Sequence, residues 1–214
     1  MNVLIGTNVV LDVLLKRTPW FADAAQIWAR CESGTRIGAL PASAFTDVFY
    51  VTRRTFSRAD AFVGIDRCLR VFNVLLVDRT ILERARHLPG NDFEDNVQIA
   101  CAITAGLDAI VTRDPNGFAE SPVPVLTPQD LLARLYRDAL VSAGGAPELV
   151  LLSSKRSEID DIIDRAGANP LPRIRKALDA LTETDAALAG NVNAVTAIEA
   201  LIFSLRSLEF RRTP

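Results

Sequence analysis

DFEDNVQIACAITAGLDAIVTRDPNGF, residues 92–118, is the stretch that decides the fold. Asp92 is a typical N-terminal cap, and apolar residues then repeat at helical spacing until Gly106, a residue that commonly ends helices. Ala109–Thr112 is a short, mostly apolar run, which is typical of a buried strand in a parallel sheet. An acidic side chain, Asp114, comes two residues after this run. A capped helix that leads into a buried strand predicts an α/β fold.

The same alternation of short strands and helices continues over residues 1–138. Strands are predicted at residues 2–5, 36–40, 73–77, 109–112 and 123–126. We expect Asn8 to cap the first helix, Pro41 to open a later one, Ser57 to cap the helix after that, and the run at 73–77 to be buried. Short strands alternating with helices indicate a three-layer α/β domain, with a central parallel sheet flanked by helices.

The composition changes after residue 138. Residues 139–147 end in the glycine-rich sequence AGGAP and are predicted to form a hinge. Residues 148–214 are predicted to form a helical extension of unknown role. Its helices are expected at about 156–166, 173–189 and 194–209. Two roles stay open for the extension: packing on a neighbour, or covering a functional cleft of the first domain.

Composition restricts the class of protein. The chain has 214 residues, 49% of them hydrophobic, and a net charge of −2, which excludes bulk disorder but allows a local basic rim. Its three cysteines are expected to be buried free thiols in a reducing compartment. The single histidine, His87, excludes a zinc site built from histidines and cysteines. No signal peptide or membrane span is apparent, so we expect a cytoplasmic protein.

Several acidic residues are candidates for a functional site. In an open parallel sheet, ligands bind at the carboxyl ends of the strands, and helix starts and strand ends could bring Asp47, Asp95 and Asp114 together there. Clustered carboxylates repel one another unless a cation lies among them, and hard oxygen ligands suit Mg²⁺ or Mn²⁺. Such a site supports phosphodiester hydrolysis.

Each of these acids also has a structural alternative. Asp95 could complement the helix dipole, Asp114 could be a turn residue, and Asp47 could be a surface carboxylate. Asp12 is interpreted as a surface acid, and Asp78 as a helix cap. The residues alone leave these alternatives open.

Three segments together resemble the PIN-domain family, which includes the VapC-like toxin ribonucleases. The opening MNVLIGTNVVLDVLLKRTPW is similar to the family's first signature, an apolar strand followed by Asp-Thr-Asn, except that Gly6 stands in place of the aspartate. Residues 92–118 resemble the second signature, an acid-led helix followed by a buried strand and Thr-Arg-Asp. SAFTDVFYVTRR, residues 43–54, resembles the middle element.

This resemblance implies a metal-dependent endoribonuclease of a toxin–antitoxin system, using Mg²⁺ or Mn²⁺ and inhibited by an antitoxin protein. It also implies homodimers in many members. Asp95 and Asp114 occupy the metal-ligand positions, and Asp47 is assigned as a further catalytic acid. The expected supporting residues are Thr7, Asn8, Asp92 and Thr112. The residues expected to bind RNA are Lys16, Arg53, Arg54 and Arg113, with Arg17 and Arg58 as further members of the basic rim.

Gly6 decides what the resemblance means for activity. Glycine has no side chain that could bind a metal, so this chain is expected to be inactive or weakened. Two explanations stay open: a substitution that silences a harmful toxin, or a degenerate PIN domain that binds RNA or protein without catalysis. A nucleotide-binding module is disfavoured because the sequence lacks a glycine-rich phosphate loop.

Overall fold

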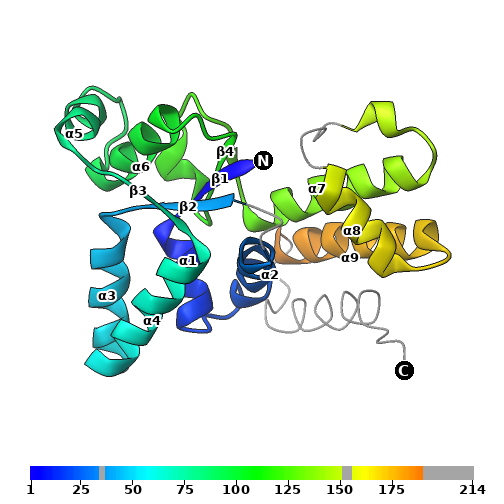
Figure 1. Cartoon of the computed structure of the whole chain (residues 1–214), viewed down its shortest axis with the longest axis horizontal. Coiled ribbons are helices and arrows are strands. Elements are labelled where there is room, and N and C mark those ends of the chain that lie inside the picture. The colour runs from blue at the N-terminus through cyan, green and yellow to red at the C-terminus, as the bar shows by residue number, and fades with distance from the viewer. Residues whose placement is uncertain (34–36, 151–155, 190–214) are drawn as a thin grey trace. The chain divides into compact units, whose positions relative to one another are not determined.

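The computed structural model of the chain describes residues 1–33, 37–150 and 156–189. These residues belong to two compact units, Met1–Pro128 and Gln129–Pro214. The first unit contains a β-sheet with helices, and the described part of the second is helical (Figure 1). The first unit ends before the predicted boundary at residue 138, because the helix that follows the last strand belongs to the second unit.

The first unit is built on a parallel sheet. Its strands in the described residues are β1 (Asn2–Ile5), β2 (Ile37–Pro41), β3 (Asn73–Leu75), β4 (Ala109–Val111) and β5 (Val125–Leu126). They lie in the order β3-β2-β1-β4-β5, and every pair is parallel. The chain proceeds from β1 outward in one direction and then returns to the other side of β1 with β4. The crevice between the ends of β1 and β4 is therefore a topological switch point, where open α/β sheets bind ligands.

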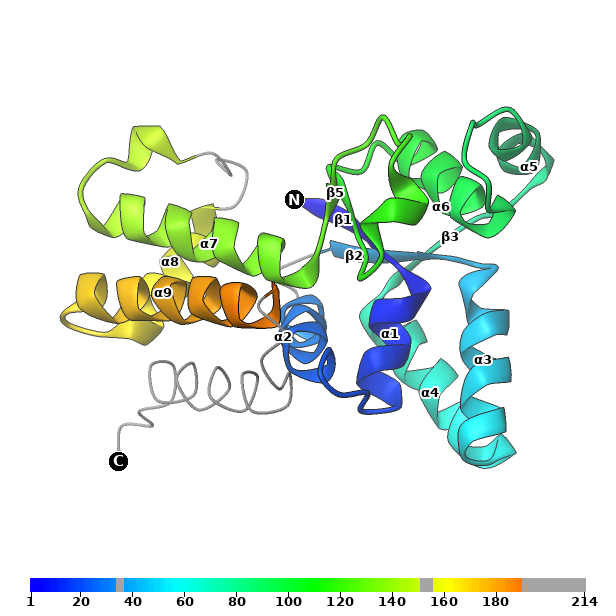
Figure 2. The same ribbon diagram turned by 180° about the vertical axis from the view of Figure 1, so that it is seen from behind.

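Helices cover both faces of this sheet, which confirms the predicted three-layer α/β architecture (Figure 1). The helices of one layer are α1 (Thr7–Leu14), α2 (Phe21–Glu32), α3 (Ala44–Thr55) and α4 (Arg58–Val71). The opposite layer contains α5 (Arg79–Arg86), α6 (Phe93–Thr104) and the short 3-10 helix η1 (Pro115–Phe118). Figure 2 shows the same arrangement from behind.

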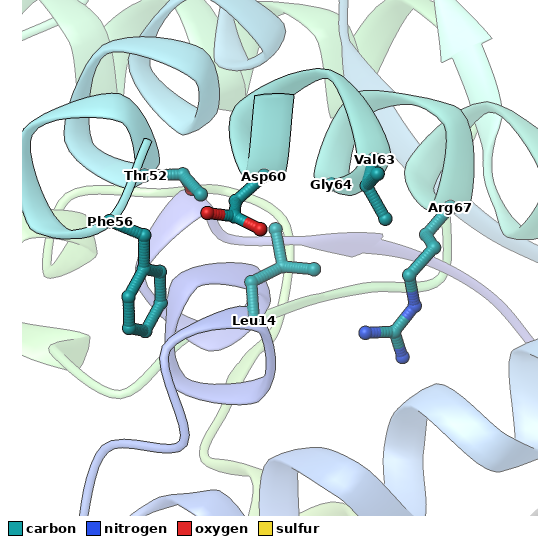
Figure 3. A pocket seen from close by; sticks show the side chains of 7 residues that line it. All are labelled: Leu14, Thr52, Phe56, Asp60, Val63, Gly64 and Arg67. Atoms are coloured by element: carbon teal, nitrogen blue, oxygen red, sulfur yellow. The ribbon is translucent and has the colours of Figure 1, made fainter. Parts of the chain in front are cut away.

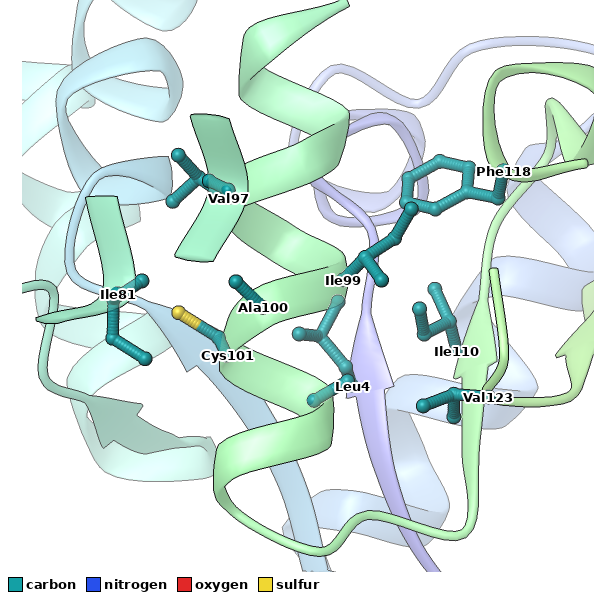
Figure 4. Packing of buried hydrophobic residues seen from close by; sticks show 11 residues of the cluster. Leu4, Ile81, Val97, Ile99, Ala100, Cys101, Ile110, Phe118 and Val123 are labelled. Atoms are coloured by element: carbon teal, nitrogen blue, oxygen red, sulfur yellow. The ribbon is translucent and has the colours of Figure 1, made fainter. Parts of the chain in front are cut away.

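The core beneath α6 holds the second layer on the sheet. Leu4 of β1 and Ile110 of β4 pack against Ile99 and Ala100 of α6, with Phe118 closing the cluster (Figure 4). All are almost completely buried, and full burial of one such large side chain contributes about 1.5–3 kcal/mol. This packing fixes α6 against the sheet, and with it the carboxylates of its first turn.

Local signals predicted the caps of three helices. Ser57, Asp78 and Asp92 each accept a hydrogen bond from a backbone N–H in the first turn of α4, α5 and α6. Gly106 follows α6 with a φ of 61°, a left-handed conformation that favours glycine. His87 lies at the exposed end of α5, and its Nδ1 is 2.7 Å from the carbonyl oxygen of Glu83.

Three local expectations were wrong. Asn8 does not cap α1, because the cap position is Gly6 and no side chain bonds there. Pro41 is the last residue of β2 rather than the first of a helix, and α3 begins at Ala44. The run at 73–77 is not buried, because β3 is the edge strand of the sheet and Leu76 beyond it is 73% exposed.

The described part of the second unit consists of helices. These are α7 (Pro128–Ala143), the 3-10 helix η2 (Pro147–Leu149), α8 (Arg156–Ala166) and α9 (Pro170–Ala189). Helix α7 extends into the predicted hinge at 139–147, so most of that segment is helical. Helices α8 and α9 agree with the predicted ones at 156–166 and 173–189, whereas the helix predicted at 194–209 lies outside the described residues.

The predicted thiol chemistry also agrees with the structure. Cys31, Cys68 and Cys101 are buried and none of the three is in a disulfide, and burial raises the pKa of Cys68 to about 12 and that of Cys101 to about 11. Among the helices of the described residues, none is long and apolar enough to cross a membrane.

Candidate active site

A pocket of about 310 Å³ opens at the switch point between β1 and β4. Its described lining comes from the start of α1, from α3, from the first turns of α6 and from the end of β4. The lining residues are Gly6, Thr7, Asn8, Leu11, Arg17, Asp47, Val51, Glu94, Asp95, Gln98, Thr112 and Phe118. The pocket therefore unites all three segments that carry the family resemblance.

Asp95 is the carboxylate whose surroundings are most unusual. It lies in the first turn of α6, behind the Asp92 cap, and is partly buried in the pocket. Its pKa is raised to about 6, mainly by burial and in addition by the negative charges of Asp92, Glu94 and Asp114. Asp114 is not among the lining residues, but its charge acts on Asp95 from the end of β4. Asp95 and Asp114, the two predicted metal ligands, are therefore near enough for the charge of Asp114 to raise the pKa of Asp95.

Gly117 makes room for the Asp95 carboxylate. A β-carbon at residue 117 would collide with Oδ2 of Asp95. The short helix η1 begins directly after Asp114. Through Gly117 it also leaves space for the Asp95 carboxylate. Gly117 is a site residue that sequence reasoning missed, since a glycine in the turn sequence PNGF looks like ordinary loop chemistry.

Glu94 is the second residue that sequence reasoning left without a role. Its carboxylate accepts hydrogen bonds from the Thr7 hydroxyl and the Gln98 amide, both at 3.2 Å. Burial raises its pKa, as do the charges of Asp47 and Asp92, whereas the two hydrogen bonds lower it. Burial also raises the pKa of Asp47. Glu94 and Asp47 therefore both line the pocket and repel each other, and the site contains more acids than the sequence signatures indicated.

Gly6 lies at the junction of β1 and α1, on the wall of this pocket. Its N–H donates to the Val111 carbonyl at 2.8 Å, and its φ of −63° and ψ of 146° are accessible to any residue. A β-carbon would lie 3.2 Å from the Val111 oxygen and 3.3 Å from Asn8 Oδ1 and Thr112 Cβ. These contacts are tight but require neighbours to shift by only a few tenths of an ångström. The backbone does not demand glycine here.

Asn8 and Thr112 connect the two strand ends behind the acids. The Asn8 amide donates to the Thr112 hydroxyl at 3.0 Å, and Asn8 Oδ1 accepts from the Arg113 N–H at 3.2 Å. Thr112 Oγ1 in turn accepts from the Asp114 N–H at 3.2 Å. These contacts explain why Asn8 is not a helix cap. Through them Asn8 and Thr112 bond to each other and to the backbone at Arg113 and Asp114.

Asp12 is buried, contrary to its interpretation as a surface acid. It is 1% exposed, and its Oδ1 lies 3.1 Å from Nη1 of Arg113 and 3.9 Å from Nη1 of Arg17. Burial raises the pKa of Asp12, and the two arginine charges oppose that rise. The Arg113 guanidinium also stacks 4.0 Å from the centre of the Trp20 ring. Arg113 therefore has a structural role, which the RNA-binding expectation did not include.

Of the other residues of the expected basic rim, Arg17 belongs to the described pocket lining, whereas Lys16, Arg53, Arg54 and Arg58 do not. Lys16 is exposed in the turn after α1, where its φ is 51°. Arg53 and Arg54 are exposed in the last turn of α3, on the helix that carries Asp47 in its first turn. Arg17 alone among the described lining residues carries a positive charge.

A second hollow, of about 250 Å³, lies between α1, α3 and α4 (Figure 3). Leu14, Phe56 and Val63 give it an apolar character. Its single carboxylate, Asp60, accepts a hydrogen bond from the Ser57 hydroxyl at the start of α4. This hollow has no acidic cluster and offers no counterpart of the chemistry at the switch point.

The acidic pocket fits a hard divalent cation in the kind of donor it offers. Carboxylate oxygens from Asp47, Glu94, Asp95 and Asp114 are the ligands that Mg²⁺ and Mn²⁺ prefer, and a cation would relieve their mutual repulsion. In residues 1–33, 37–150 and 156–189, however, no three acidic, histidine or cysteine side chains converge into a complete metal site. Gly6 adds no donor, so the set is short of one ligand where the family signature places an aspartate.

Comparisons with known protein families and solved structures give matches to this chain. The sequence model of the PIN domain matches residues 2–116, which is more than half of the chain. Among solved structures, the chain is similar to the VapBC2 crystal structure from Rickettsia felis, which was determined with a promoter DNA fragment. The TM-score is 0.47 and the identity 14%, over 59% of this chain and 98% of that chain. No curated protein sequence matches.

Proposed function

The chain belongs to the PIN-domain family, and from this premise we propose that its acidic pocket is a divalent-cation-dependent endoribonuclease site that lacks one ligand at Gly6. One observation carries the proposal: Asp95 is held among Asp92, Glu94 and Asp114 with its pKa raised to about 6. Like charges are seldom kept together without a use, and perturbed carboxylates in a pocket are typical of functional sites.

The residues of the pocket would have different roles in RNA cleavage. Asp95 and Asp114 would hold Mg²⁺ or Mn²⁺, with Glu94 and Asp47 adding negative charge beside them. The bound cation would supply a Lewis acid for the phosphoryl group and would favour ionisation of the attacking water. Thr7 fixes the Glu94 carboxylate through the 3.2 Å hydrogen bond. These contacts keep the acids in place before a substrate arrives, which lowers the reorganisation that the reaction requires.

The biological setting we propose is a toxin of a toxin–antitoxin system that cleaves RNA. The support comes from family membership and from the signatures that resemble VapC-like toxins. Exposed aromatic side chains on α3, at its C-cap and on α4 also support a protein partner such as an antitoxin: Tyr50 is 64%, Phe56 56% and Phe62 47% exposed. A reading frame for a small DNA-binding protein beside the gene would agree with this setting.

A second candidate is a degenerate PIN domain that binds RNA or protein without cleaving it. Gly6 itself favours this candidate, as does the absence of a three-ligand metal group from the described residues. The two candidates differ in whether a carboxylate at residue 6 gives RNA cleavage.

Gly6→Asp is the variant that separates them. We expect it to cleave a fluorescent single-stranded RNA in Mg²⁺ or Mn²⁺, and we expect EDTA to abolish the cleavage. Asp95→Ala or Asp114→Ala in the same background should also abolish it, whereas Gly6→Asn, which has the same shape without the charge, should stay inactive or nearly so. If Gly6→Asp folds with an unchanged melting temperature and cleaves no RNA, the non-catalytic candidate is correct.

A further inference from the structure

The proposed nuclease needs a group that attracts the negatively charged strand into an acidic pocket. Asp47, Glu94 and Asp95 repel phosphate, and of the described residues lining the pocket only Arg17 is basic. Arg17 comes from the turn that follows α1, and its side chain is 33% exposed. Its position combines access to the pocket with access to solvent.

The neighbours of Arg17 leave its guanidinium available. Asp12 Oδ1 is 3.9 Å away, which is an ion-pair distance but too long for a hydrogen bond. In the parts of the chain that the structure describes, Arg17 donates no side-chain hydrogen bond and forms no ion pair with the pocket acids Asp47, Glu94 and Asp95. The Asp12 carboxylate therefore attracts the Arg17 guanidinium but does not occupy its hydrogen-bond donors.

Arg113 occupies the stronger position on the same carboxylate. Its Nη1 donates to Asp12 Oδ1 at 3.1 Å, and its planar group stacks on Trp20. Because these contacts engage both the edge and the face of the guanidinium, Arg113 has little capacity left for a substrate. Asp12 therefore interacts unequally with the two arginines. It forms a close ion pair with Arg113 and a longer one with Arg17.

We propose that Arg17 binds a phosphate of the RNA strand at the pocket, and that Asp12 and Arg113 are positioning residues which hold it there. This inference rests on the proposed function, which it deepens by naming the substrate contact. An arginine can donate two parallel hydrogen bonds to phosphate oxygens, and this geometry is not reproduced by lysine.

Binding of RNA without cleavage tests the proposal. A fluorescein-labelled single-stranded oligoribonucleotide is titrated with the unmodified chain in EDTA, and the dissociation constant is measured by anisotropy at several salt concentrations. The variants are Arg17→Ala, Arg17→Lys and Arg79→Ala, the last removing an exposed arginine of α5 that is paired with Glu83. Melting temperatures are measured in parallel.

We expect Arg17→Ala to weaken binding about tenfold and to reduce the slope of log K against log salt by about 0.7, the loss of one phosphate contact on a single strand. Arg17→Lys should recover the slope but not the full affinity, and Arg79→Ala should change both far less. The melting temperature of Arg17→Ala should stay close to that of the unmodified chain.

Two results would overturn the proposal: equal effects of Arg17→Ala and Arg79→Ala, or no measurable RNA binding by the unmodified chain. These results are distinct from failure of the nuclease function. If Gly6→Asp does not cleave RNA while Arg17→Ala still weakens RNA binding selectively, the nuclease assignment fails and the phosphate contact stands. If Gly6→Asp cleaves RNA and Arg17→Ala leaves binding unchanged, only the Arg17 assignment fails.

Discussion

Asn8 and Thr112, 104 residues apart in sequence, are joined side chain to side chain by a 3.0 Å hydrogen bond across the ends of β1 and β4. The same Asn8 side chain accepts from the Arg113 N–H, so one amide connects the two strands at the edge where the acids gather. This connection keeps Gly6, which directly follows β1, in a defined position relative to Asp114, which follows β4.

Removing the Asn8 amide should loosen that connection. We expect Asn8→Ala to lower the free energy of unfolding by about 1–3 kcal/mol, because it leaves part-buried partners on Thr112 and Arg113 without their bonds. Asn8→Asp keeps an acceptor for the Arg113 N–H and should cost less. Thermal and urea denaturation measure both variants, and equal stability of Asn8→Ala and the unmodified chain would contradict this role.

Gly117 offers a way to move the Asp95 carboxylate without changing it. Because a β-carbon at residue 117 would collide with Asp95 Oδ2, we expect Gly117→Ala in the Gly6→Asp background to reduce Mn²⁺ affinity and RNA cleavage at least tenfold. Asn116→Ala, a change to the neighbouring exposed residue of η1, should leave both nearly unchanged. Parallel behaviour of the two variants would show that Asp95 does not depend on the space at Gly117.

The raised pKa of Asp95 predicts a pH-dependent stability. The folded-state pKa of about 6 exceeds the unfolded value of about 3.9, so the folded protein binds more protons between these values. The contribution of Asp95 to stability is therefore unfavourable above pH 6 and is relieved as the pH falls towards 4.

We expect Asp95→Asn to be more stable than the unmodified chain at pH 7.5 in EDTA, on the order of 1–3 kcal/mol after allowance for partial exposure to solvent. The difference should shrink as the pH is lowered to 5. Melting temperatures measured across this range provide the comparison, and parallel curves for the two proteins would exclude the proposed charge repulsion at Asp95.

Two glycines, Gly38 within β2 and Gly6 directly after β1, should tolerate a methyl group very differently. A β-carbon at Gly38 would lie 2.7 Å from Cys31 Sγ and 2.9 Å from Phe72 Cδ1, whereas the nearest atom to one at Gly6 is 3.2 Å away. We expect Gly38→Ala to lose about 1–3 kcal/mol through overpacking, and Gly6→Ala to lose less than about 1 kcal/mol. Equal losses of stability in the two variants would mean that close packing requires glycine at residue 6.

The sequence predicts well those features that depend on neighbours in the chain. The caps at Ser57, Asp78 and Asp92 were recognisable because a cap bonds to residues two or three positions ahead. The sheet was predictable because short apolar runs between helices rarely have another explanation. The edge position of β3 was not, since an apolar run carries no information on strand order.

The site was only partly predictable for the same reason. Asp95 and Asp114 were predicted from recognisable signatures, but the Glu94 carboxylate is held by Thr7, 87 residues away in sequence. Asp12 looked like a surface acid because its partner Arg113 is 101 residues distant. Contacts of this kind exist only after the strands have been ordered, so a pattern read along the chain does not contain them.

The central claim is that this pocket is a divalent-cation site short of one ligand at Gly6. Isothermal titration of Mn²⁺ into the unmodified chain and into Gly6→Asp at pH 7.5 tests it most directly. We predict weak or undetectable binding to the unmodified chain, and binding of one Mn²⁺ to Gly6→Asp at least tenfold more tightly, which Asp95→Ala removes. Equal Mn²⁺ affinity of the two proteins, with both fully folded, would contradict the claim.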